Sequence, residues 1–176
     1  MRVWALACAF LCAIPVAGAV AREKHLVRAA AKIVGLDGRE IGIAKFAQSS
    51  HGVLIEIEVH GLTPGAHAIH IHSAGVCDMK RKFENAGPDF SPTPKMHGYF
   101  GKGGPHAGDL PNEYAGADGT LHAAILASAI SLGKGKKTIF DKDGASIIVH
   151  ANGDDYTNQP AGNSGPRVAC GVIRKL

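Results

Sequence analysis

The segment 53–59 constrains the fold most, because apolar residues alternate along it with leucine or glutamate. Alternation with a period of two is typical of a β-strand that buries one face and leaves the other in water. We therefore expect its β-branched side chains to face a core and its two acidic side chains to face solvent. The expected core residues are Val53, Ile55, Ile57 and Val59, and the expected exposed residues are Glu56 and Glu58.

Further short segments of strand-like sequence follow one another along the chain, and Asp-Gly pairs separate several of them. Such pairs are typical of tight turns between strands. No long segment has the period of a helix. The sequence therefore predicts an all-β fold, a sandwich or a barrel. The other expected strands cover residues 27–36, 41–48, 65–72, 113–117, 120–127, 146–150 and 167–173.

The first 21 residues have the pattern of a secretory signal peptide. Arg2 precedes an apolar run over residues 5–16, and small residues end at Ala21. The run is short for a membrane span, so we expect cleavage after Ala21 rather than an anchor. The prediction is a signal peptide over residues 1–21 and one exported domain over residues 22–176, with no membrane association after cleavage.

Export also bears on the cysteines, because Cys8 and Cys12 leave with the signal peptide. The two that remain, Cys77 and Cys170, can form one disulfide in an oxidising compartment. Two buried free thiols are the alternative.

The charge of the chain is close to balanced, with 19 lysines and arginines against 15 aspartates and glutamates. No basic run is interleaved with aromatic residues. These features argue against a nucleic-acid partner.

Histidines are concentrated in the expected strand 65–72, which carries three of the ten. Residues two apart on a strand share a face, so His70 and His72 should point together and His67 the opposite way. Two imidazoles facing one point could bind a metal. They could equally form the polar face of a half-buried strand.

A long stretch between Cys77 and Asp109 is rich in glycine, proline and charged residues and contains no convincing strand. Loops of this length usually have a function. His97, His106 and Asp109 offer the nitrogen and oxygen donors that zinc prefers. A solvated loop with incidental histidines is the alternative. A second glycine-rich loop, 151–166, lies between His150 and Arg167.

Five motifs contain these candidate residues. They are Gly65-x-His67-x-x-His70-x-His72, Gly87-Pro88-x-Phe90, Gly104-Pro105-His106-x-Gly108-Asp109-Leu110, Val149-His150 followed by Asp154-Asp155, and Gly162-Asn163-Ser164-Gly165-x-Arg167-x-Ala169-Cys170-Gly171-Val172-Ile173. Taken together, the motifs resemble those of the bacterial exported copper/zinc superoxide dismutases, and the matches span nearly the whole chain beyond residue 21. The resemblance implies a Greek-key β-barrel or sandwich of about eight antiparallel strands, with two long loops at the metal site.

The resemblance also implies roles for individual residues. Asp154 would join His70 to His97 and so orient a copper ligand and a zinc ligand. Arg167 would attract and hold the superoxide anion beside copper. The implied copper ligands are His70, His72 and His150; the implied zinc ligands are His97, His106 and Asp109; His67 would be structural, and Cys77 would pair with Cys170.

One position departs from the family pattern. Asp89 stands where the family has a histidine that bridges copper and zinc. A carboxylate is a far weaker proton acceptor than an imidazole at neutral pH. Our hypothesis is that Asp89 completes a four-ligand zinc site with His97, His106 and Asp109 and leaves copper with three histidines.

These features predict an exported, periplasmic superoxide dismutase that uses copper and zinc, with activity lowered by Asp89. The alternative is a non-catalytic copper- and zinc-binding protein of the same fold. A homodimer is a further expectation.

Overall fold

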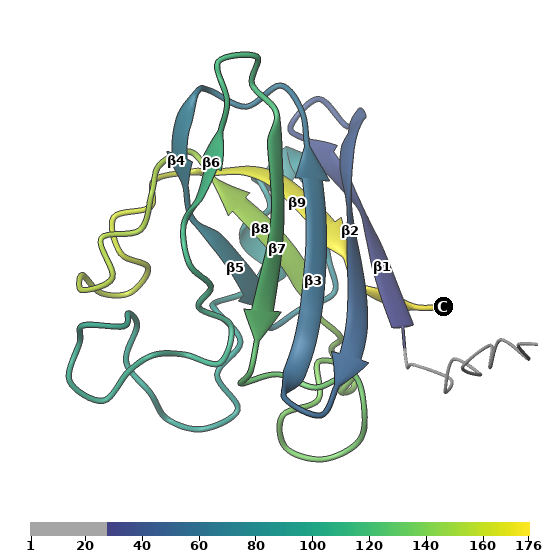
Figure 1. Cartoon of the computed structure of the whole chain (residues 1–176), viewed down its shortest axis with the longest axis vertical. Helices are drawn as coiled ribbons and strands as arrows, with labels where there is room; N and C mark the ends of the chain where they lie inside the picture. The colour runs from purple at the N-terminus through teal and green to yellow at the C-terminus, as the bar shows by residue number, and fades with distance from the viewer. Residues whose placement is uncertain (1–27) are drawn as a thin grey trace, which may run out of the picture.

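The computed structural model describes residues 28–176, which contain ten strands and two single-turn 3₁₀ helices joined by turns and loops. The expected signal peptide, residues 1–21, lies outside the described residues. The all-β prediction is confirmed (Figure 1). The elements are β1 (Arg28–Gly35), β2 (Glu40–Ser49), β3 (Gly52–Val59), β4 (Gly65–His67), β5 (Ile69–His72), η1 (Met79–Arg81), η2 (Glu84–Ala86), β6 (Glu113–Ala115), β7 (Leu121–Ala127), β8 (Ser146–His150), β9 (Arg167–Val172) and β10 (Arg174–Lys175).

The strands form one antiparallel sheet that curls into a nearly closed barrel. Their order is β4-β6-β7-β3-β2-β1-β9-β8-β5, and β10 pairs with β1. β4 follows β3 in the chain but lies beyond β7 and β6 in the sheet. After β5, the chain returns through β6 and β7, which completes a Greek-key connection. Because β4 and β5 are consecutive in the chain and stand at the two ends of this order, they bring the edges of the sheet together.

The expected strand 65–72 is divided into β4 and β5 at Ala68. The reason is a change of partner, because β4 pairs with β6 whereas β5 pairs with β8. Between them, the amide of Ala68 donates to the carbonyl of Asn152 and its carbonyl accepts from the amide of His150, at 2.8 and 2.9 Å. The histidine strand is therefore held against the β8 end of the barrel.

Alternation along the strands fills the barrel with apolar side chains. In β3 the four predicted core residues are buried and both glutamates are exposed, as predicted. In β5, Ile69 and Ile71 belong to the same core, so His70 and His72 point to the other face of the sheet. Burial of each isoleucine stabilises the fold by about 1.5–3 kcal/mol. The barrel thus gives the two histidines a rigid support.

Two long loops lie on one side of this barrel (Figure 1). Residues 73–112 connect β5 to β6 and contain η1 and η2 but no strand, and residues 151–166 connect β8 to β9. The predicted disulfide is present: Cys77 in the first loop is bonded to Cys170 in β9, with 5.7 Å between their Cα atoms. Within residues 28–176, no helix is long and apolar enough to cross a membrane.

Candidate metal centre

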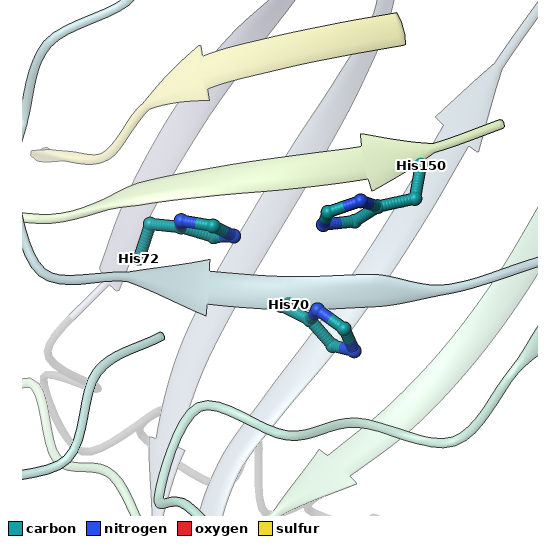
Figure 2. Close-up of side chains that lie close together, drawn as sticks. All are labelled: His70, His72 and His150. Atoms are coloured by element: carbon teal, nitrogen blue, oxygen red, sulfur yellow. The ribbon is translucent and has the colours of Figure 1, made fainter. Parts of the chain in front are cut away.

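Three histidines from two paired strands meet at the outer face of the barrel. His70 and His72 lie on β5, and His150 is the last residue of β8, which pairs with β5. Figure 2 shows the three side chains close together, with the rings of His72 and His150 pointing toward each other. One ring nitrogen from each histidine lies within 4.8 Å of the others, and all three residues are buried. The structure therefore brings the three predicted copper ligands together.

In each ring one nitrogen has an acceptor and the other has none. His72 Nδ1 donates to the carbonyl of Gly87 at 2.8 Å, His150 Nδ1 to that of Gly165 at 3.1 Å, and His70 Nε2 to Asp154 Oδ2 at 3.1 Å. The opposite nitrogens are buried and make no hydrogen bond. Such orphaned nitrogens are rare unless a metal or another ligand completes them. Three imidazole nitrogens that converge on one point suit copper.

The pKa values of two of these histidines are lowered, which favours the neutral form that binds a metal. Burial lowers the pKa of His72 to about 4, although the nearby Asp89 carboxylate opposes the shift. Burial likewise lowers the pKa of His150 to about 3, and the neighbouring His70 adds to the shift. Both rings are therefore neutral at physiological pH, with a free lone pair on Nε2.

A second cluster combines His97, His106, Asp89 and Asp109, the four residues predicted to bind zinc. Nδ1 of each histidine lies 3.2 Å from Asp89 Oδ2. The same two atoms lie 3.1 and 3.3 Å from Asp109 Oδ1. Zinc bound tetrahedrally at about 2.0 Å would hold its ligand atoms about 3.3 Å apart. The four atoms thus have the spacing of a zinc site.

Hydrogen bonds between the two histidines and the two carboxylates shift the pKa values of this cluster. Burial lowers the pKa of His97, but hydrogen bonds to Asp109, Asp154 and Asp89 outweigh burial and raise it to about 11. Hydrogen bonds to Asp109 and Asp89 raise the pKa of His106 to about 9. Burial alone would raise the pKa of Asp89, yet the same two histidines hold it well below its usual range. A zinc ion would replace the protons of these two histidines.

Asp154 connects the two clusters. Its Oδ2 lies 3.1 Å from His70 Nε2, and its Oδ1 lies 3.1 Å from His97 Nε2. The amide of Tyr156 donates to Oδ1 and fixes the carboxylate. Asp154 therefore contacts both of the histidines that the resemblance implied it would join.

His67 lies apart from both clusters. Its two ring nitrogens face the carbonyls of His150 and Thr63, each at 2.7 Å. It therefore ties the start of the histidine strand to the end of β8.

Comparison with known proteins agrees with this geometry. Residues 40–173 match the family model described as copper/zinc superoxide dismutase. The chain belongs to the copper/zinc superoxide dismutase family. Copper and zinc are the cofactors that this family implies.

The family assignment is supported by named relatives and by solved structures. Copper-zinc superoxide dismutase 1 of Aquifex aeolicus is 40% identical over 166 residues, which cover 93% of this chain and 96% of the relative. A superoxide dismutase-like protein from Bacillus subtilis has a crystal structure that matches with a TM-score of 0.77 and 39% identity, over 81% of this chain and 95% of that chain. The copper/zinc superoxide dismutase of Brucella abortus matches with a TM-score of 0.68 and 29% identity, over 84% of this chain and 99% of that chain.

Arg167 lies at the entrance of this superoxide dismutase site. Its Nη1 donates to the carbonyl of Phe83 at 2.7 Å and its Nη2 to that of Gly87 at 2.8 Å. With 14% of its side chain exposed, Arg167 lines a surface cavity together with His150. An anion in this cavity would meet the guanidinium of Arg167 and the side of the histidine cluster that His150 forms.

Sequence reasoning missed several groups that position the site. The carbonyl of Gly87 accepts from both His72 and Arg167, and Ser164 Oγ lies 3.0 Å from His150 Nδ1. Glu84 Oε2 lies 3.9 Å from Arg167 Nη2 at the rim of the cavity. Backbone carbonyls are common to every residue, so no sequence signal could have identified them; the Gly-Pro pair at 87–88 marks only the turn.

Proposed function

We propose that this protein is a superoxide dismutase, which converts two superoxide ions and two protons into dioxygen and hydrogen peroxide. One observation carries the proposal. In a chain of this family, three buried histidine nitrogens without partners lie beside an arginine that reaches a surface cavity. A reaction site needs such an opening, whereas a structural metal can be fully enclosed.

The two metals are assigned to the two clusters. His70, His72 and His150 would hold copper, and His97, His106, Asp109 and Asp89 would hold zinc. Bound copper supplies the electron transfer, by alternating between two oxidation states, while zinc is redox-inert and stabilises the fold. Asp154 orients His70 and His97, and the carbonyls of Gly87 and Gly165 orient the other two copper ligands.

The protein supplies substrate binding and electrostatics. Arg167 is fixed by two carbonyls, so its positive charge stays at the cavity and draws the superoxide anion toward His150. Asp89 is ionised at neutral pH because His106 and His97 hold its pKa well below the usual range. It cannot deliver protons there, so water supplies them, and we expect activity below that of relatives with an imidazole at this position.

The cellular setting is also part of the proposal. Residues 1–21 would direct export and be removed, which leaves residues 22–176 as a soluble periplasmic domain. The Cys77–Cys170 disulfide supports an oxidising compartment. We further propose a homodimer, for which light scattering of the purified protein is the test.

A non-catalytic metal-binding protein is the second candidate. The ionised carboxylate of Asp89 favours it, because this group cannot take part in proton transfer at neutral pH. In this case copper would bind to the three histidines without turnover.

The decisive experiment measures superoxide dismutation by zinc-loaded protein titrated with copper. A superoxide dismutase shows a rate that rises in proportion to bound copper, up to one copper per chain. His72→Ala should abolish this rise, and His122→Ala serves as the matched control, because His122 is exposed on β7. A rate that stays at background with copper fully bound would instead establish the metal-binding function.

A further inference from the structure

We infer that Asp89 binds both metals at once, with one carboxylate oxygen for each, so that copper has a fourth protein ligand. The inference rests on the proposed function in one respect, because it takes the histidine cluster as a copper site and the mixed cluster as a zinc site. It changes our sequence-based hypothesis, in which Asp89 binds zinc alone.

One carboxylate oxygen of Asp89 faces the zinc cluster. Oδ2 lies 3.2 Å from Nδ1 of both His97 and His106. The same two distances for Asp109 Oδ1 are 3.1 and 3.3 Å. Asp89 Oδ2 and Asp109 Oδ1 are thus equivalent in their approach to the two histidines, as two ligands of one tetrahedral ion would be.

The other oxygen faces the copper cluster. Asp89 Oδ1 lies 3.3 Å from His72 Nε2 and 3.5 Å from His70 Nδ1. These separations are close to those on the zinc side. Oδ1 therefore lies at the distance expected between two ligands of a shared ion.

The nitrogens that face Oδ1 are the ones with no other partner. His72 Nδ1 contacts the Gly87 carbonyl and His70 Nε2 contacts Asp154. The opposite nitrogens, His72 Nε2 and His70 Nδ1, are buried and make no hydrogen bond. Two ring nitrogens and a carboxylate oxygen thus converge at one buried point, as the ligands of a single cation do.

The backbone keeps Asp89 in this orientation. Asp89 forms an antiparallel bridge with His72, and the next residue, Phe90, donates its amide to the Ile71 carbonyl at 2.7 Å. The side chain of Asp89 is 3% exposed. The carboxylate is therefore fixed between the clusters and cannot turn toward solvent.

Magnetic coupling between the two sites tests the inference. The full chain is loaded with Cu(II) and with either zinc or Co(II) in the zinc site, and the copper signal is recorded by electron paramagnetic resonance at equal copper content. A shared carboxylate couples Cu(II) to Co(II), so we expect the copper signal to lose most of its intensity in the cobalt form. This comparison requires only the wild-type protein.

Two variants locate the coupling. Asp89→Asn retains one oxygen donor and replaces the other with an amide group that cannot bind a metal, so the copper signal should recover in the cobalt form. Copper affinity of the zinc-loaded variant should fall by at least about tenfold, the smaller effect seen when a group that only orients a ligand is lost. Asp109→Asn is the matched control, because the Asp109 carboxylate approaches the zinc histidines His97 and His106 in the same way as Asp89 Oδ2 does, and with both metals bound it should retain the coupling.

Each outcome separates the inference from the proposed function. A copper signal of full intensity in the wild-type cobalt form, with both sites filled, overturns the bridge whether or not the enzyme is active. Coupling that is lost in Asp89→Asn and kept in Asp109→Asn supports the bridge even if no dismutation is measured. Coupling that persists in Asp89→Asn at full occupancy assigns it to another path and overturns the bridge.

Discussion

Removal of the Cys77–Cys170 disulfide should lower the stability of the fold by several kcal/mol. The bond closes a loop with a sequence separation of 93 residues. In the chain-entropy model, a cross-link of this span stabilises the folded state by about 4.7 kcal/mol at 25 °C. With a urea dependence of about 2 kcal/mol per molar, the unfolding midpoint should fall by roughly 2 M.

The assay is urea unfolding of the metal-free protein, because a bound metal would add its own stabilisation. Three samples are compared: oxidised wild type, wild type reduced with dithiothreitol, and Cys77→Ala combined with Cys170→Ala. The reduced wild type isolates the cross-link, since Cys170 is fully buried and its truncation also removes packing. Equal midpoints for oxidised and reduced wild type would refute the reasoning.

The same bond should affect the site. It joins the loop that carries the carbonyls of Phe83 and Gly87 to β9, the strand that carries Arg167. Reduction should therefore lower the dismutation rate at fixed copper content.

Other predictions concern single residues and protons. Arg167→Ala should lower the dismutation rate by about tenfold with copper content unchanged, which is the lower end of the range for electrostatic steering. The rate should also lose most of its dependence on salt concentration. An unchanged rate in a stopped-flow assay would contradict this prediction. Asp154→Asn should weaken copper and zinc binding by about 10- to 100-fold each, as measured by competition with chelators, because it weakens the contacts to His70 and His97. Zinc uptake at pH 7.5 should release about two protons, since zinc displaces them from His97 and His106, whose pKa values are about 11 and about 9. Zinc affinity should therefore rise with pH from 7 to 9. Copper binding should release no protons from His72 and His150, whose pKa values are about 4 and about 3. Calorimetry in buffers of different protonation enthalpy counts the protons that each metal releases.

Strand positions could be predicted from the sequence because burial on one face leaves a local record. The alternation in β3 is visible in seven consecutive letters, and the structure follows it residue by residue. The break at Ala68 could not be predicted, because it results from a change of strand partner that involves residues far along the chain.

Part of the candidate site could likewise be predicted from the sequence. The sequence gives the chemical types of the ligands, and the geometry of a strand places His70 and His72 on the same face. Grouping them with His150, and His97 with Asp89, depended on resemblance before the structure brought these residues together.

The sequence by itself therefore determined the strands, the core faces and the donor types, because these depend on neighbours along the chain. Only the tertiary structure decided that Asp154 touches His70 and His97, that Gly87 holds both His72 and Arg167, and that the two oxygens of Asp89 face different clusters. The physical reason is that two loops pack against the barrel and set the side-chain orientations and backbone hydrogen bonds at this site. The hydrogen bonds involved join residues up to 84 positions apart in the chain.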